Sequence, residues 1–262
     1  MHTLTVQVEG IGLWSPQLAD FNALRHLLAG GMPAAPGIRP AAAALSPNER
    51  RRAPESVLVA IEAASQAIAL SGRTMENLAC VFASAYGDQA TTDYMCRVLA
   101  RVPTELSPTR FHNAVHNAAA GYWTIATACR APSSAICAGN ASFGAGLLEA
   151  AVLARAEDRP VLLVCSDSAG IGPLGELIGC TSAFGCALVV SPSTHTGTRL
   201  RLAATASAPR HPPLPAECLA WMRDNSSAAG LPLLAMLANG DGDCVLVAAD
   251  QLGLHVQMET NA

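Results

Sequence analysis

The stretch from Ala131 to Ala150 constrains the fold of this chain more than any other part of it. Ser133–Ala138 is typical of a short strand, Gly139 and Asn140 of a tight turn, and Ala141–Arg155 of a helix built mostly from small residues. Small side chains allow a helix to run through the interior against other backbone. The free N–H groups and the positive end of the helix dipole then face the side chain at the tip of the turn.

In an enzyme that uses a thiol, this arrangement lowers the pKa of a cysteine and exposes its sulfur. The side chain at the tip here is Asn140. A neutral carboxamide is a poor nucleophile, although it can donate and accept hydrogen bonds. The turn therefore predicts a backbone arrangement that could present a nucleophile, with a side chain at its tip that is not one.

The remaining pattern alternates strands with helices, which predicts a layered α/β fold with a mixed sheet. Gly10 and Gly12 are expected to break the first strand, and residues 31–54, rich in Pro and Ala, to be irregular, as is the loop Pro103–Pro108. The expected strands are Leu4–Val8, Leu78–Ser84, Val161–Ser166, Cys186–Val190, Arg199–Ala204, Cys244–Ala249 and Leu254–Met258. The expected helices are Phe21–Leu28, Val57–Leu70, Thr91–Leu99, Ala114–Cys129 and Ala216–Met222.

Composition excludes several classes of protein. The chain carries a net charge of −4 and lacks the basic stripe that nucleic-acid binding requires. No apolar run has the length of a membrane span, and the first residues do not resemble a signal peptide. Nine irregularly spaced cysteines, most of them in apolar runs and none in a C-x-x-C pair, predict mostly buried thiols in a reducing cytoplasm. We expect no metal and no cofactor.

Several segments, in order and spacing, resemble the β-ketoacyl synthases. The opening Val6–Pro16 is similar to the start of the sequences in that family. A second stretch is similar to the segment that precedes the active cysteine of the family. It comprises Ser107-Pro108, Asn117, Ala120-Gly121, Thr124-Ile125 and Pro132-Ser133. Phe184-Gly185 is similar to the glycine-containing segment that lies near the end of the first half of the family's fold. Counting from Pro132 places Asn140 where the family has its nucleophile. The resemblance covers about residues 4–205 and implies a thiolase-like (ketoacyl-synthase) layered fold with mixed sheets.

The second half departs from the family. Active synthases carry a His-Gly-Thr and a later Gly-His motif, and neither His211 nor His255 stands in such a context. The resemblance therefore implies a complete ketoacyl-synthase-like N-terminal half, residues 1–198, and a strongly reduced C-terminal half, residues 199–262, packed on the same core. Nucleophile and both imidazoles are missing together, which removes the condensing machinery.

Family members without the cysteine are chain length factors, and truncated ones of this kind accompany aryl polyene synthesis. The resemblance thus implies a catalytically inactive subunit that forms a heterodimer with an active β-ketoacyl synthase in polyketide or fatty-acid biosynthesis, and that meets the acyl carrier protein of the complex. It would help to shape the acyl tunnel. The candidate tunnel residues are Arg110, Phe111, Tyr94 and Met95, and the candidate interface residues are His112, His116, Asn117, Tyr122, Ser134 and Ile136.

Two other functions stay open. The chain could be a small acyltransferase or thioesterase that uses Cys137 or Ser142, although we expect Cys137 to be a buried strand residue and Ser142 to satisfy a backbone group. It could also be a carrier-protein-binding module without a synthase partner, and Arg50–Arg52 could dock an acidic carrier protein, although such a run is more often a solvated face.

Four further patterns suggest chemistry and are assigned structural roles. His112 and His116 have the spacing of zinc ligands on a helix, but Asn113 replaces the glutamate of the metalloprotease motif. Cys165–Asp167 follows a buried strand, as hydrolase residues do. Gly240–Asp243 contains the Asp-Gly signal of an ordinary hairpin. Gly170, Gly172 and Gly175 lack the order of a dinucleotide-binding loop.

Overall fold

The computed structural model describes residues 3–34, 39–192 and 197–259. Within them, eight strands form one mixed sheet in the order β3-β2-β4-β5-β1-β6-β8-β7, with β2 parallel to β3 and β4 and the other neighbours antiparallel. The strands are β1 (Thr3–Trp14), β2 (Ala79–Ala83), β3 (Ser133–Ile136), β4 (Val161–Asp167), β5 (Phe184–Pro192), β6 (Thr198–Thr205), β7 (Asp243–Ala249) and β8 (Leu252–Met258).

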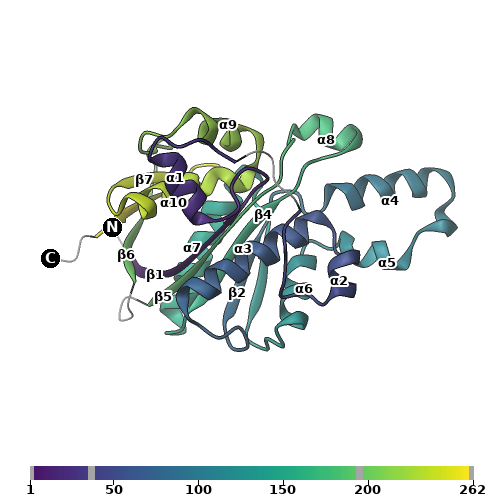
Figure 1. Cartoon of the computed structure of the whole chain (residues 1–262), viewed down its shortest axis with the longest axis horizontal. Helices are drawn as coiled ribbons and strands as arrows, with labels where there is room; N and C mark the ends of the chain where they lie inside the picture. Colours follow the sequence, from purple (N-terminus) through teal and green to yellow (C-terminus); the bar gives the residue numbers. More distant parts are fainter. Residues whose placement is uncertain (1–2, 35–38, 193–196, 260–262) are drawn as a thin grey trace.

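The helices pack on this sheet or project from it, as Figure 1 shows. The α-helices are α1 (Phe21–Leu28), α2 (Pro47–Arg52), α3 (Glu55–Ser71), α4 (Gln89–Arg101), α5 (Pro108–Phe111), α6 (Ala118–Ala126), α7 (Ser142–Ala156), α8 (Gly172–Ile178), α9 (Ala216–Asp224) and α10 (Leu231–Asn239). Short 3₁₀ turns are η1 (Pro103–Glu105), η2 (His112–Ala114), η3 (Gly139–Ala141) and η4 (Ser226–Gly230). The layered α/β fold with a mixed sheet is confirmed.

Helix α7 is the interior helix that the small residues predict. It contacts β4 and β5 from the first part of the sheet and β7 from the last part. A Cβ atom on Gly144 would lie 2.1 Å from the backbone oxygen of Val247, so only glycine allows β7 to approach this closely. Helix α3 packs against β1, β5 and β4 and belongs to a second cluster of buried side chains that includes Trp123 of α6.

The expected break of the first strand at Gly10 and Gly12 is wrong. Strand β1 continues to Trp14 and pairs with both β6 and β5, with a register shift between Val8 and Gly10. Cβ atoms on Gly10 and Gly12 would lie 2.0 and 1.9 Å from backbone oxygens of α3. These glycines therefore serve a close strand–helix contact, which a sequence pattern cannot separate from a turn.

The expected helix Ala114–Cys129 is shorter than predicted. Residues His112–Ala114 form η2, Val115 is extended (φ −76°, ψ 139°), and α6 begins only at Ala118. Conversely, residues 31–54 are not entirely irregular, because Ser46 and Glu49 form a capping box that starts α2. The loop expected at Pro103–Pro108 contains η1 and the first residue of α5.

The hairpin predicted at Gly240–Asp243 is also wrong. Gly240 has φ 82° and ends α10, while β7 and β8 join through Asp250 and Gln251. The helices α8 and α10 were missed. The boundary expected between residues 198 and 199 falls at the first residue of β6, a strand that pairs with β1 in the same sheet; a division of the chain into two halves stays a prediction.

Candidate functional site

Asn140 lies at the tip of the turn between β3 and α7. It is exposed, and its Oδ1 accepts a hydrogen bond from Ser226 Oγ at 2.8 Å. Ser142 is 1% exposed, donates to the backbone oxygen of Gly139 at 2.7 Å and accepts from the amide of Ala138 at 3.0 Å. Its hydroxyl thus satisfies the backbone of the turn, as the sequence predicts.

A small cavity of about 90 Å³ opens beside Asn140. This volume is well below the roughly 300 Å³ at which ligand pockets usually begin, so it is too small to bury an acyl thioester. His211, to which the sequence pattern assigns no role, lines this cavity, but its Nδ1 lies 2.8 Å from the backbone oxygen of Pro212. The other residues around it are Gly144, Pro209, Arg210, Met222, Ala229, Pro232, Val245, Leu246 and Val247.

Cys137 is exposed, so the expectation of a buried strand residue is wrong. Strand β3 ends at Ile136 and is the edge of the sheet, which places the next side chain beyond the strand. The thiol donates to the backbone oxygen of Ala85 at 3.0 Å. A carbonyl acceptor does not activate a thiol, which needs a base to become a nucleophile.

We therefore expect no enzymatic acylation of this thiol. When the pure chain is incubated with an acyl thioester, Cys137 should be labelled no faster than a thiol in a short peptide of the same sequence. Intact-mass analysis over time, with Cys137→Ala as the control, measures the difference. Rapid formation of a stable adduct that the substitution removes would contradict the expectation and favour an acyltransferase.

The Cys165–Asp167 stretch is structural. Asp167 is 1% exposed; its Oδ1 accepts from Ser84 Oγ at 2.7 Å and from the amide of Ala85 at 2.9 Å, and its Oδ2 accepts from Ser227 Oγ at 2.6 Å. Burial raises the pKa of the Asp167 carboxyl, while these hydrogen bonds oppose that shift. Burial also raises the pKa of the Cys165 thiol. The carboxyl joins three segments through hydrogen bonds.

His112 and His116 do not share a helix face. The Nε2 atom of His112 lies 3.2 Å from the hydroxyl of Tyr122, whereas that of His116 lies 3.0 Å from the backbone oxygen of Ser84. The structure separates them because Val115 is extended between η2 and α6. In the part of the chain that the structure describes, no group of three or more His, Cys, Asp or Glu side chains is arranged to hold a metal ion.

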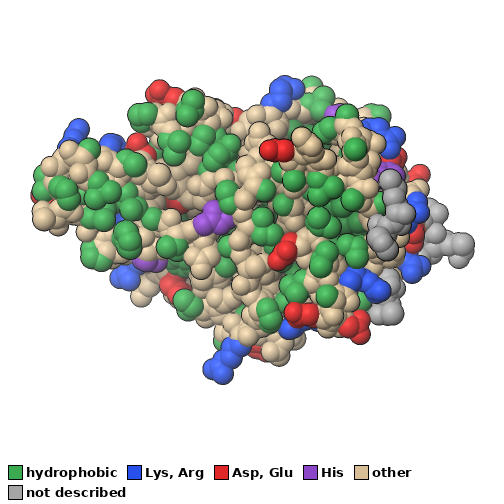
Figure 2. All heavy atoms as spheres, turned by 180° about the vertical axis from the view of Figure 1, so that it is seen from behind, with side chains coloured by type: hydrophobic (Ala, Val, Ile, Leu, Met, Phe, Trp, Pro, Cys, Tyr) green, Lys and Arg blue, Asp and Glu red, His purple; other side chains and the backbone are tan. Residues whose placement is uncertain are grey.

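The four candidate tunnel residues lie on an arm. Helices α4 and α5, joined by η1, stand off the body at the right of Figure 1. The Cζ atom of Arg110 lies 4.3 Å from the ring centroid of Tyr94, Phe111 is 53% exposed, and Met95 is half-buried. From behind, Figure 2 shows this arm on the left, with a hollow between it and the body and apolar side chains on both.

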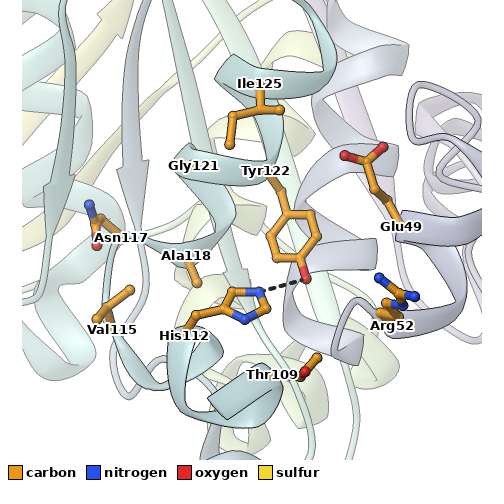
Figure 3. Close-up of a pocket in the computed structure, with 10 residues that line it drawn as sticks. All are labelled: Glu49, Arg52, Thr109, His112, Val115, Asn117, Ala118, Gly121, Tyr122 and Ile125. Carbon is orange, nitrogen blue, oxygen red and sulfur yellow. Dashed lines mark hydrogen bonds between the residues drawn. The ribbon is translucent and has the colours of Figure 1, made fainter.

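Where the arm returns to the body, a pocket of about 350 Å³ opens between α2, α5 and α6 (Figure 3). This volume lies within the usual range of ligand pockets. Three candidate interface residues line it, namely His112, Asn117 and Tyr122, whereas none of the candidate tunnel residues does. The remaining lining residues are Glu49, Arg52, Thr109, Val115, Ala118, Gly121 and Ile125.

The tyrosine in this pocket has a fixed orientation. Its hydroxyl donates to Asn113 Oδ1 at 3.2 Å, so the contact with His112 requires a proton on the imidazole Nε2, which donates to the same hydroxyl. Burial raises the pKa of Tyr122. The sequence reasoning missed Thr109 and Ile125 as lining residues, although the helical spacing of Ala118, Gly121, Tyr122 and Ile125 marks one face of α6.

The sheet has an open edge at β3, close to this pocket through α6. The backbone oxygens of Pro132 and Ile136 accept hydrogen bonds from the amides of Cys80 in β2 and of Ser84 just after it, at 3.0 and 3.1 Å. Because alternate residues of a parallel strand face the same neighbour, Ser133 and Ala135 direct their backbone groups to the open edge. Ser134 and Ile136, the remaining interface candidates, are half-buried in this strand.

Large apolar side chains are exposed on α6, which contacts β3, and on α8, which contacts α4. Ile125 of α6 is 74% exposed and Leu177 of α8 is 83% exposed. Such exposed apolar surface is typical of protein–protein contact. Among the described residues, no helix has the length and apolar character needed to cross a bilayer.

Residues 30–251 match the family model of the β-ketoacyl synthase N-terminal domain, and the chain therefore belongs to the β-ketoacyl synthase family. The thiolase-like fold is thereby confirmed. The comparison with curated proteins found no match.

Three solved structures show the same fold. In the complex of the ketosynthase ApeO with its chain length factor ApeC from Xenorhabdus doucetiae, one chain matches with a TM-score of 0.74 and 23% identity over 97% of this chain and 99% of that one. The ishigamide ketosynthase/chain length factor matches with 0.73 and 12% identity over 98% and 100%. The complex AntDE:AntF, a type II polyketide ketosynthase with its acyl-carrier protein, matches with 0.64 and 15% identity over 79% and 70%.

Proposed function

We propose that this chain is a non-catalytic subunit of the chain length factor type, which pairs with an active β-ketoacyl synthase and helps to shape its acyl tunnel. The observation that carries the proposal is the tip of the turn before α7. A carboxamide occupies it, and the cavity beside it is about 90 Å³. A condensing enzyme needs a thiolate and room for the acyl chain at this place.

The family and the neighbouring structures support a role in a synthase complex. Two of the matching structures are described as ketosynthases with a chain length factor, and a third as a ketosynthase with an acyl-carrier protein. By this analogy the partners are a synthase and the carrier protein of a polyketide or fatty-acid pathway, with aryl polyene synthesis as the particular proposal. We expect the complex to work in the cytoplasm.

The open edge of β3 is the proposed centre of the interface with the synthase. A strand that ends a sheet with unpaired backbone groups is a template for pairing with another chain. The exposed Ile125 of α6, a helix that contacts β3, extends an apolar surface from it. The pocket at Tyr122 lies on the same side, between α2 and α6, and forms the proposed far wall of the tunnel.

Co-expression tests this proposal directly. We expect the chain to copurify with its synthase as an equimolar complex in sizing chromatography, and to aggregate or self-associate when expressed alone, because its apolar interface would then face water. A control synthase of fatty-acid type from an unrelated pathway should not be retained. A well-behaved monomer that no β-ketoacyl synthase binds would contradict the proposal.

A further inference from the structure

The arm that carries the four candidate tunnel residues has little packing of its own. In α4 the buried residues are Gln89, Thr91 and Asp93, all in its first turns, and the rest of the helix projects from the body. Helix α5 has only four residues and none is buried. A helix of this length is unstable by itself, so its position depends on contacts with neighbouring elements.

Tyr94 supplies two such contacts from the middle of α4. Its hydroxyl accepts a hydrogen bond from the amide of Ser107 at 3.2 Å, and its ring lies 4.3 Å from the guanidinium carbon of Arg110. Ser107 is the N-cap of α5, and its backbone oxygen accepts from the amides of Arg110 and Phe111 at 3.1 and 2.9 Å. One aromatic side chain therefore holds both the start of α5 and its third residue.

The residues next to Arg110 reach the pocket. Thr109 precedes it on α5 and His112 follows at the start of η2, and both line the 350 Å³ pocket at Tyr122. His112 also donates to the Tyr122 hydroxyl. Tyr94 and Arg110 themselves lie outside this pocket. A shift of α5 would consequently move one wall of the pocket without changing any residue that lines it.

We infer that Tyr94 and Arg110 form a brace that positions the Thr109–His112 wall of the pocket, and that they set product length through this wall and not by contact with the acyl chain. The inference rests on the proposed function, and it assigns the two residues a positioning role. A side chain that lined the tunnel would act through its own volume. A brace acts by keeping α5, and with it the pocket wall, in a fixed position.

Hydrogen exchange and product analysis of the purified heterodimer separate these roles. In Tyr94→Ala, we expect the amides of residues 107–112 to exchange about fivefold to tenfold faster, since a hydrogen bond and a cation–π contact are lost together. With its carrier protein and substrates, the same complex should give a broader range of products, shifted by at least one additional condensation. Tyr94→Phe keeps the ring under Arg110 and should restore most of both properties.

Two further variants, one in the brace and one outside it, test the same inference. Arg110→Ala removes the cation and leaves the Tyr94 hydroxyl in place, so it should loosen α5 even if Tyr94→Ala does not assemble. Arg101→Ala, an exposed position on the same helix, should behave as the wild type. Unchanged exchange in both brace variants, or faster exchange with wild-type product lengths, would overturn the inference. If the wild-type chain binds no synthase, the proposed function fails instead.

Discussion

Replacing Ala135 with proline should weaken the heterodimer by about 100-fold, or roughly 3 kcal/mol, while leaving the isolated subunit folded. Ala135 directs its N–H group to the open edge of β3, away from β2. Proline removes this donor and places its ring where a pairing strand must approach. It is tolerated on an edge strand whose N–H faces solvent, because no bond inside the fold is lost.

The affinity of the two subunits, measured by dissociation of the co-purified heterodimer on dilution, provides the test. Ala135→Val is the matched control, since it enlarges the side chain but keeps the backbone donor, and it should bind within a few fold of the wild type. Circular dichroism of the three co-expressed complexes should show the same secondary structure. Wild-type affinity of the proline variant would mean that the synthase does not pair with β3.

Removal of the Asp167 carboxyl should strongly destabilise the subunit. In Asp167→Ala, the hydroxyls of Ser84 and Ser227 and the amide of Ala85 lose their acceptor in the interior. Each unsatisfied buried group costs about 1–3 kcal/mol, so we expect a loss of about 3 kcal/mol or more in the free energy of unfolding. Denaturant unfolding of the heterodimer or of a solubilised subunit measures it.

Asp167→Asn separates the shape of this side chain from its charge. Its carbonyl oxygen can accept from Ser84 and Ala85, and its amide can donate to the Ser227 oxygen, so we expect a loss below about 1 kcal/mol at pH 7. A cost for asparagine as large as that for alanine would show that the negative charge itself is needed. That outcome would contradict a predominantly hydrogen-bonding role.

The stabilities of the wild type and of Asp167→Asn should also depend differently on pH. Since burial raises the pKa of Asp167 above its ordinary value of 3.8, the folded chain holds this proton more tightly than the unfolded chain. The stability from this group is then fully present below pH 3.8 and is lost as pH rises through the folded pKa. Wild type should therefore gain stability relative to Asp167→Asn as the pH falls from neutrality. The neighbouring thiols of Cys165 and Cys180, whose pKa values burial raises, do not titrate in this window.

Part of the candidate site can be predicted from the sequence. The strand, the glycine turn and the small-residue helix around Asn140 follow from local pattern, and the structure has them within two residues of the predicted bounds. The exposure of Cys137 did not follow, because a strand's own sequence does not say where it ends or whether it lies at the edge of a sheet. The pocket at Tyr122 was also beyond reach, since it joins Arg52 of α2 to Thr109 of α5 across more than fifty positions of sequence.

The sequence by itself determined the alternation of strands and helices, the interior helix and the amide at its start, because periodicity and residue size act locally. It also carried the order of motifs that places the chain among the β-ketoacyl synthases. Only the tertiary structure decided that Gly10 and Gly12 serve contact with α3, that His112 and His116 point to different partners, and that Tyr94 faces Arg110 and not the pocket. These are properties of side chains brought together by packing, and packing depends on segments that are distant in the chain.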